Sequence, residues 1–423
     1  MLRKIPQAGT RITILDLLSG FKSIFVDQEK NFIEALSDYL PSRYVFLVSS
    51  GKTACYIILQ ALKSFSSKKE VILPAYTAPG VILPVLKANL KPVLCDISMA
   101  DFNIDLDLLP KIITKDTLCV VPAYMFGVAV SGIENLKARM PDIFVVEDCA
   151  QSMGSRVGGR NSGCFSDIGF LSFNRGKNLP TYGGGCIFTD SKEIAKKIEA
   201  EIGKLKKQGA FFKLMLPFKL IALSLAAKPF IYGTLYPVIS HFKDNQIPEG
   251  FSIGKYTGFQ AGVGLSLLTK IEEFSEKRYH NATTAMKGLA DIKDITIPHI
   301  RKEARCAFNR LPVVFKSQDL MIKVEKALWK TGIDTSRMYL KPIHHIFGLG
   351  YKAEDFPNAN YFAQRVLTLP VHPLVKQEDL DKIIDVFRGI FTPLESPALQ
   401  GGDEVIYNSG FLKKGRGIKP RPF

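Results

Sequence analysis

Short apolar runs recur along the first 190 residues of the chain, and stretches of helical length separate several of them. Each run is rich in Val, Ile or Phe and lacks strict alternation of apolar and polar positions, as expected for strands covered on both faces. The seven runs predicted as strands are 44–50, 71–76, 91–97, 117–124, 143–149, 168–173 and 185–190. Segments 51–65 and 130–140 between them have helical spacing. Strand, helix and strand in series predict an α/β fold with a mostly parallel central sheet covered by helices.

The C-terminal part of the chain has a different pattern. Strand-like runs at 294–300 and 310–315 alternate with helical patterns at 323–332 and 379–391. A chain of 423 residues is also too long for one small core. We therefore expect a large domain over 1–282, a smaller α+β domain over 283–390, and a basic tail over 391–423 that lacks apolar periodicity.

Composition narrows the class of protein. Hydrophobic residues make up 46% of the chain and charged residues 23%, which is typical of a folded protein. The first twenty residues lack the uninterrupted apolar core of a signal peptide. Seven scattered cysteines have neither the CxxC spacing of a zinc site nor the pattern of a disulfide framework. We expect a cytoplasmic protein with reduced cysteines and no bound metal.

The net charge of +16 is concentrated in two places. Seven lysines and no carboxylate lie between residues 203 and 243, and five further Lys or Arg and no carboxylate lie between 409 and 423. The remainder of the chain is close to balanced, which argues against a nucleic-acid-binding surface spread over the protein.

Segment 203–250 is apolar and lysine-rich, and it has two interpretations. Lysines interrupt every long apolar run, and Pro217, Pro229 and Pro237 are expected to break helices, so a transmembrane span is not predicted. The first interpretation is an insertion buried against the domain or in a dimer interface. The second is a peripheral contact of 203–243 with an anionic membrane surface on the inner face of the membrane, which the absence of carboxylates favours.

Polar groups follow three of the predicted strands, at the edge where parallel α/β sheets bind ligands. The turn 49–54, Ser-Ser-Gly-Lys-Thr-Ala, leads into a helix and can hold a phosphate or simply cap that helix. Asp148 ends an apolar run and can pair with a cation or cap the next helix. Ser172 and Lys177 flank a turn that precedes three glycines. A lysine amine, a carboxylate and a phosphate turn are together the groups that pyridoxal 5'-phosphate requires.

With these groups the chain resembles the DegT/DnrJ/StrS sugar aminotransferases. That family has the fold of aspartate aminotransferase, which is fold type I of the pyridoxal-phosphate enzymes. The resemblance is carried by 147–185, EDCAQSMGSRVGGRNSGCFSDIGFLSFNRGKNLPTYGGG, and by 49–54. It implies that Lys177 is the Schiff-base lysine, that Asp148 pairs with the pyridine nitrogen, and that Ser172 binds the phosphate. Gln151 matches a contact to the cofactor ring. The turn residues Gly51, Lys52 and Thr53 match the family's Ser-Gly-Thr phosphate turn.

The resemblance also implies the reaction and the assembly. The family transfers an amino group from an amino acid, here expected to be glutamate, to a keto sugar, here expected to be nucleotide-linked, in the biosynthesis of cell-surface polysaccharides and glycoconjugates. The expected assembly is a homodimer. The loop 338–345, Met-Tyr-Leu-Lys-Pro-Ile-His-His, resembles the family's substrate loop, so His344 and His345 are expected to contact the sugar, as is Tyr182.

The chain departs from the family pattern at several positions. Ala78 stands where an aromatic residue usually stacks on the pyridine ring, and Lys52 stands where threonine is usual. The acidic residue common in the glycine cluster is missing, and the family's Asn-x-Arg segment is not recognisable before 257–262. The alternative function is therefore a catalytically silent, membrane-associated scaffold or regulator that retains the fold. The presence of Asp148 and Lys177 favours the aminotransferase.

Overall fold

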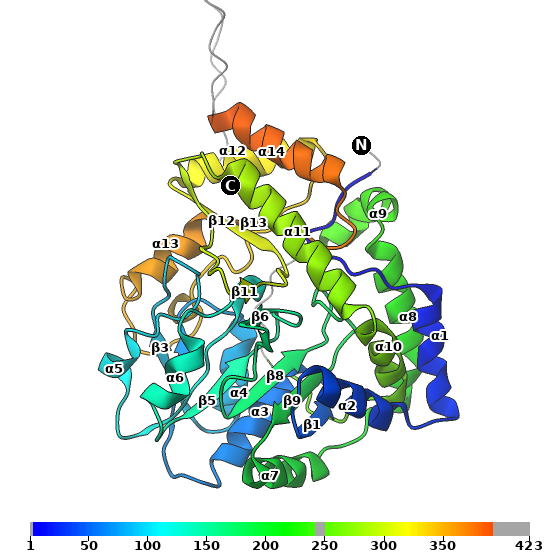
Figure 1. The fold of residues 1–423 in the computed structure, drawn as a ribbon, viewed down its shortest axis with the longest axis vertical. Helices are drawn as coiled ribbons and strands as arrows, with labels where there is room; N and C mark the ends of the chain where they lie inside the picture. Colours follow the sequence, from blue (N-terminus) through cyan, green and yellow to red (C-terminus); the bar gives the residue numbers. More distant parts are fainter. Residues whose placement is uncertain (1–2, 242–249, 392–423) are drawn as a thin grey trace, which may run out of the picture.

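The seven predicted strands form one central sheet in the computed structural model, which describes residues 3–241 and 250–391 (Figure 1). The spatial order is β1-β9-β8-β5-β4-β2-β3. The strands are β1 (Tyr44–Val48), β2 (Glu70–Pro74), β3 (Lys91–Cys95), β4 (Thr117–Val120), β5 (Phe144–Asp148), β8 (Ile168–Ser172) and β9 (Gly185–Thr189). Only β9 runs antiparallel to its neighbours β1 and β8. The prediction of a mostly parallel central sheet is confirmed.

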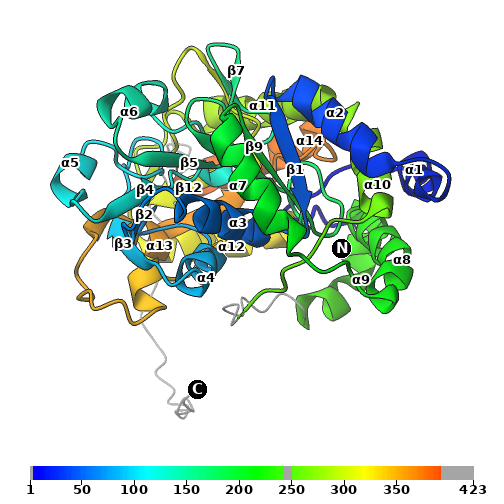
Figure 2. The same ribbon diagram turned by 90° about the horizontal axis from the view of Figure 1, so that it is seen from below.

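Helices cover both faces of this sheet (Figure 2). Along β2, Val71 and Leu73 join one buried apolar cluster and Ile72 joins the other, so the strand contributes to a core on each side. The covering helices and short helical turns are α2 (Gln28–Tyr39), α3 (Gly51–Leu62), η2 (Pro79–Val81), α4 (Ile82–Lys87), α5 (Leu109–Ile112), η3 (Met125–Gly127), α6 (Ile133–Arg139), α7 (Lys192–Gly203) and α10 (Gly258–Leu268). Side chains of serine and threonine cap several of them, as Ser50 does for α3 and Ser191 for α7.

A second, antiparallel sheet forms at the C-terminal end of the chain, drawn at the top of Figure 1. Its strands are β10 (Ile295–Thr296), β12 (Leu311–Phe315) and β13 (Val366–Leu369), and its helices are α12 (Gln318–Lys330), η4 (Ile343–His345), α13 (Pro357–Arg365) and α14 (Gln377–Phe391). The long helix α11 (Ile271–Leu289) packs against α14. The expected boundary after residue 282 falls inside α11, and the expected tail 391–423 lies outside the described residues except for Phe391. The division into domains stays a prediction.

A third, small sheet joins the two parts of the chain. Strand β11 (Ala304–Arg305) pairs with β6 (Arg156–Val157), and β6 pairs with β7 (Arg160–Asn161). The segment that leads from β11 into β12 therefore lies next to the loop that follows β5. Residues 306–310 are placed beside the carboxyl edge of the central sheet in this way.

The inserted segment forms two helices, α8 (Ala210–Ala226) and α9 (Pro229–His241). The expectation that all three prolines break helices was wrong for Pro217 and Pro237, which lie inside α8 and α9. A proline removes a single N–H donor, and Pro229 stands at the first position of α9, where that donor is not needed. No single helix in the described part of the chain is long and apolar enough to cross a membrane. The α8–α9 pair passes that test only when joined, and it bends by 109°.

Candidate active site

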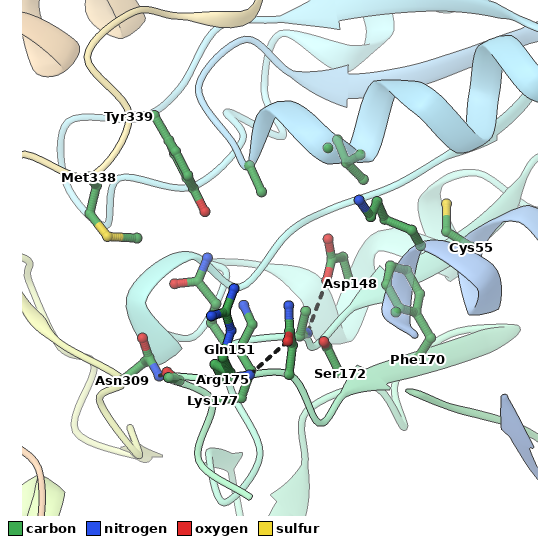
Figure 3. Close-up of a pocket in the computed structure, with 18 of the residues that line it drawn as sticks. Cys55, Asp148, Gln151, Phe170, Ser172, Arg175, Lys177, Asn309, Met338 and Tyr339 are labelled. Atoms are coloured by element: carbon green, nitrogen blue, oxygen red, sulfur yellow. Dashed lines mark hydrogen bonds between the residues drawn. The ribbon is translucent and has the colours of Figure 1, made fainter. Parts of the chain in front are cut away.

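A cavity of about 390 Å³ lies at the carboxyl edge of the central sheet, between the ends of β5 and β8 and the first turn of α3. Six of the predicted site residues line it, namely Gly51, Lys52, Asp148, Gln151, Ser172 and Lys177 (Figure 3). They come from three separate stretches of sequence. The structure thus places the lysine, the carboxylate and the turn around one common space.

Lys177 lies in the loop that connects β8 to β9, and its side chain is half-buried at the cavity wall. Its backbone N–H donates to the carbonyl of Asn174 at 3.2 Å, and its own carbonyl accepts from the Thr10 hydroxyl at 3.3 Å. Burial lowers the pKa of Lys177 to about 8, the charge of Asp148 opposes that change, and the charge of Arg310 adds to it. A substantial fraction of this amine is therefore neutral near pH 8, and only a neutral amine is a nucleophile.

Asp148 is the last residue of β5, and its carboxylate faces the same cavity (Figure 3). The carboxylate accepts a hydrogen bond from the backbone N–H of Ala150 at 2.9 Å. Burial raises its pKa, while the Ala150 N–H and the charge of Lys177 oppose the rise. Within the described residues this carboxylate accepts one hydrogen bond, so it can accept further hydrogen bonds from a cationic group in the cavity.

The neighbouring Glu147 has a structural role. Its carboxylate is fully buried and accepts hydrogen bonds from the hydroxyl of Tyr124 and from the backbone N–H groups of Gly163 at 2.9 Å and Phe165 at 2.8 Å. These contacts fix the loop after β7 against the sheet. Of the two adjacent carboxylates, Asp148 is thus the one that faces the cavity.

The turn before α3 approaches Ser172 closely. A Cβ atom on Gly51 would lie 2.9 Å from the Cβ of Ser172, so this position requires glycine. Ser50 accepts from the backbone N–H of Thr53 at 3.0 Å and caps the helix. Lys52 lines the cavity, and its amine donates to the carbonyl of Gly250 at 3.4 Å.

Thr53 does not line the cavity. Its side chain is fully buried, lies 3.0 Å from the hydroxyl of Ser49 and donates to the carbonyl of Ser252 at 3.3 Å. The hydroxyl groups of Ser49, Ser50 and Thr53 therefore hold the turn together from behind, and a direct contact of Thr53 with a ligand in the cavity is not supported.

Gln151 is almost fully buried at the wall of the cavity. Its side-chain oxygen accepts from the backbone N–H of Phe126 at 3.3 Å, and its side-chain nitrogen lies 3.5 Å from the sulfur of Met125. These contacts fix the orientation of the side-chain amide of Gln151. A fixed amide at the cavity wall is compatible with the expected contact to the cofactor ring.

The three residues expected to contact a sugar lie outside the cavity lining. The ring centroids of His344 and His345 lie 4.2 Å apart with the rings tilted by 55°, and a ring nitrogen of each lies near the carbonyl oxygen of Ala353, at 3.4 and 2.8 Å. They are held by the loop that precedes α13. Tyr182 packs its ring against the charged ends of Arg175 and Lys219. None of the three reaches the space between Asp148 and Lys177.

Three residues that the sequence did not single out complete the cavity, Arg175, Arg310 and Tyr339 (Figure 3 shows Arg175 and Tyr339). Tyr339 belongs to the loop 338–345 that was expected to contact substrate, and the contact of its histidines with a sugar stays a prediction. Arg310 directly precedes β12 and donates to the side-chain oxygen of Gln7 at 3.0 Å. Its buried Nε atom has no hydrogen-bond partner among the described residues. Nothing in the local pattern around Arg310 marks it as a site residue.

These residues fit pyridoxal phosphate. The cavity offers the amine of Lys177, the buried carboxylate of Asp148, and a helix-capping turn in which Gly51 leaves room beside Ser172. The aromatic rings on the cavity wall belong to Phe170 and Tyr339, whereas Ala78 lines it where the family usually has an aromatic residue.

Comparison with known proteins agrees with this arrangement. The model of the DegT/DnrJ/EryC1/StrS aminotransferase family matches residues 14–388. The spore coat polysaccharide biosynthesis protein SpsC of Bacillus subtilis is 26% identical over 85% of this chain and 89% of its own length. The dTDP-3-amino-3,4,6-trideoxy-alpha-D-glucose transaminase of Micromonospora megalomicea subsp. nigra is 24% identical over 90% of this chain and 96% of its own.

A solved structure has the same fold. The putative sugar aminotransferase Spr1654 from Streptococcus pneumoniae, in its PLP form, superposes with a TM-score of 0.73 at 20% identity and covers 92% of this chain and 98% of its own. The fold is that of the type I pyridoxal-phosphate enzymes, as expected. With a family model that spans nearly the whole described chain, this protein belongs to the DegT/DnrJ/EryC1/StrS aminotransferase family.

Proposed function

We propose that the protein is a pyridoxal-phosphate-dependent aminotransferase that moves an amino group from glutamate to a nucleotide-linked keto sugar. The observation that carries the proposal is that Lys177 and Asp148 line one cavity beside the turn at Gly51. The names of the related transaminase and of the spore coat polysaccharide protein support a sugar substrate and a role in polysaccharide biosynthesis.

The bound cofactor would supply an electron-accepting ring on which the donor's amino group is taken up and then released. Lys177 would hold the cofactor covalently and, when released by the donor, carry a proton between the donor's α-carbon and the cofactor. Its pKa of about 8 suits that work, because the amine accepts and returns a proton near neutral pH.

Asp148 would keep the pyridine nitrogen protonated. Its carboxylate is buried and accepts one hydrogen bond from the residues that the structure describes, so a protonated ring nitrogen would be the partner that compensates its charge. Ser172 and the turn at Gly51 would hold the phosphate, with Lys52 adding positive charge. Gln151 would lie along the ring.

Arg310 is our candidate for the carboxylate of the amino donor. Arg310 is half-buried at the cavity wall, and Gln7 accepts a hydrogen bond from one of the five N–H groups of its guanidinium. Arginine pairs with carboxylates through two parallel hydrogen bonds, which would orient an amino acid toward Lys177. By contrast, Arg278 is fully buried and donates to the backbone carbonyls of Gly9, Phe308 and Asn309, so its role is structural.

We further propose that the working unit is a homodimer, as the family resemblance implies. Light scattering of the purified protein during gel filtration tests this statement. A mass of one chain at micromolar concentration would contradict it.

Product analysis tests the reaction. The protein is incubated with pyridoxal phosphate, glutamate and a panel of keto sugar nucleotides, and amino sugar products are identified by mass spectrometry. We expect one member of the panel to gain an amino group in wild-type samples and none in Lys177→Ala samples. If no sugar nucleotide of the panel is aminated but a lipid-linked keto sugar is, the proposal of a nucleotide-linked acceptor is wrong and the aminotransferase assignment stands.

A further inference from the structure

Large apolar side chains are exposed mainly in two segments of the chain. Within the described residues, fifteen of the nineteen exposed large apolar side chains lie in 14–26 or in 211–238. Phe25 is 87% exposed and Phe211 is 76% exposed. Scattered apolar residues are normal on a protein surface, but a concentration of this kind marks a binding surface.

Helix α8 carries an apolar stripe on the side opposite its buried side. At about 100° per residue, its exposed residues fall on one narrow face, whereas the fully buried Leu216 and Leu220 lie on the other side of the helix. The residues of the stripe are Phe211, Leu214, Phe218, Ile221 and Leu225. The packing of α8 against the body therefore uses one side of a mostly apolar helix and leaves the other apolar side in solvent.

The first exposed segment lies beside α8. It consists of α1 (Ile14–Phe21), the short helix η1 (Lys22–Ile24) and residues 25 and 26. Both views of the molecule place α1 next to α8 on the same side (Figures 1 and 2). One groove between them is lined by Phe25 and Phe218, and a second by Ile14 and Ile221. The two segments thus form one continuous surface, here called the α1–α8 face.

Lysines border this face. On α8, Lys213 and Lys219 each lie about 120° round the helix from the centre of the apolar stripe, one on either side. Lys228 follows α8, and Lys22 follows α1, and both are exposed. Long lysine side chains in this position extend their stems along an apolar surface and keep the ammonium group at its polar edge.

Two carboxylates lie near one end of the face. Asp27 and Glu29 line the groove that Phe25 and Phe218 share. Burial and the charge of Asp27 raise the pKa of Glu29, and Lys213, Lys255 and Lys207 oppose the rise through their own charges. The surroundings of these two carboxylates are therefore basic.

We infer that the α1–α8 face binds the surface of an anionic lipid bilayer, with the apolar stripe in the acyl boundary and the lysines at the headgroups. A second copy of this chain is a poorer occupant, because a two-fold contact would set the same lysines against each other. An anionic bilayer satisfies both the apolar residues and the positive border. The bend of 109° after α8 allows that helix to lie in the plane of the membrane while α9 turns away.

Vesicle binding tests the inference without any need for activity. Full-length protein loaded with pyridoxal phosphate is sedimented with vesicles of phosphatidylcholine, with and without phosphatidylglycerol, over a series of salt concentrations. We expect binding to the anionic vesicles that weakens as salt rises but does not vanish, because salt screens the charges and leaves the apolar contact. Lys213→Gln and Lys228→Gln, which each remove one exposed lysine, are each expected to weaken binding about fivefold.

Matched variants distinguish binding through the α1–α8 face from non-specific binding of the protein to vesicles. Phe211→Ser with Phe218→Ser should abolish vesicle binding, whereas Phe65→Ser with Leu86→Ser, which removes two exposed apolar side chains elsewhere, should leave it unchanged. Lys192→Gln with Lys196→Gln on α7 is the control for charge.

Two results would overturn the inference. One is that the wild-type protein stays in the supernatant with anionic vesicles at low salt. The other is that Phe211→Ser with Phe218→Ser changes the oligomeric state in solution and leaves vesicle binding as it was. In the second case the face is a contact between copies of this chain.

Discussion

Lys177 is the central residue of the proposed site. In the cofactor-free protein its burial is expected to lower the free energy of unfolding. Burial lowers its pKa to about 8, against about 10.4 in an unfolded chain. Below pH 8 the amine is protonated in both states, so the folded state carries the full penalty of a buried charge. Between about pH 8 and 10.4 only the unfolded state is protonated, and the free energy of unfolding rises with pH as the penalty is relieved.

We therefore predict that cofactor-free Lys177→Met is more stable than the cofactor-free wild type at pH 7, by roughly 2 to 3 kcal/mol. The difference should shrink as the pH approaches 10. Urea unfolding at the two pH values measures it. A variant that is less stable at pH 7, or a difference independent of pH, would show that the amine is not a destabilising buried group.

Arg310 yields a second prediction at the scale of one residue. Arg310→Gln should raise the KM for glutamate about tenfold to a hundredfold, because a charge-assisted pair with the donor carboxylate is lost. The kcat at saturating donor should change less, and Arg310→Lys should recover part of the affinity. Steady-state kinetics with glutamate as the varied substrate provide the comparison. An unchanged KM would assign the donor carboxylate to another residue.

Among single residues, the sequence predicted those site residues that lie at or just after the end of a predicted strand. Asp148 and Ser172 end β5 and β8, and Lys177 lies in the next loop, so the parallel sheet alone brings them together. Arg310 could not be found in this way, because it reaches the cavity through the pairing of β11 with β6 across about 150 residues of chain. His344 contacts the loop before α13, and its predicted contact with the sugar stays a prediction.

At the scale of elements, the first turn of α3 can be tested through Gly51. A methyl group there would lie 2.9 Å from the Cβ of Ser172, so Gly51→Ala must displace the turn or β8. We predict a loss of about 1 to 3 kcal/mol in the free energy of unfolding, together with weaker binding of pyridoxal phosphate. Gly203→Ala is the control, since a Cβ at Gly203 meets nothing within 4 Å. Equal effects of the two substitutions would mean that the close approach to Ser172 is unimportant.

The helices α8 and α9 show that a local sequence pattern does not include the tertiary contacts that hold a helix in place. Apolar content and prolines predicted interrupted structure over 203–250, yet α8 continues through Pro217 and α9 through Pro237. Packing of Leu216 and Leu220 and the hydrogen bond from Tyr232 to Asp334 hold these helices to the body. Such tertiary contacts outweigh the loss of one backbone hydrogen bond at each proline, and they are not visible in a local pattern.

At the scale of the whole molecule, the order of apolar runs was sufficient to predict the central sheet, because strands buried on both faces have a distinctive composition. The antiparallel direction of β9 and the route by which 306–310 reaches the cavity depend on long-range pairing. The same holds for the α1–α8 face, which unites residues about 200 positions apart. Sequence pattern thus predicted the scaffold and the strand-end chemistry, and tertiary contacts supplied the rest.

The central claim is that Lys177 carries pyridoxal phosphate and uses it to take an amino group from a donor. The direct measurement is the visible absorbance of the protein reconstituted with the cofactor, followed after addition of glutamate without an acceptor. We predict a yellow wild-type protein whose absorbance band disappears as about one 2-oxoglutarate forms per bound cofactor. The folded Lys177→Ala protein should have no such band and should form no 2-oxoglutarate. A wild-type protein without the band, or a Lys177→Ala protein that keeps it, would contradict the account and favour a silent relative of the family.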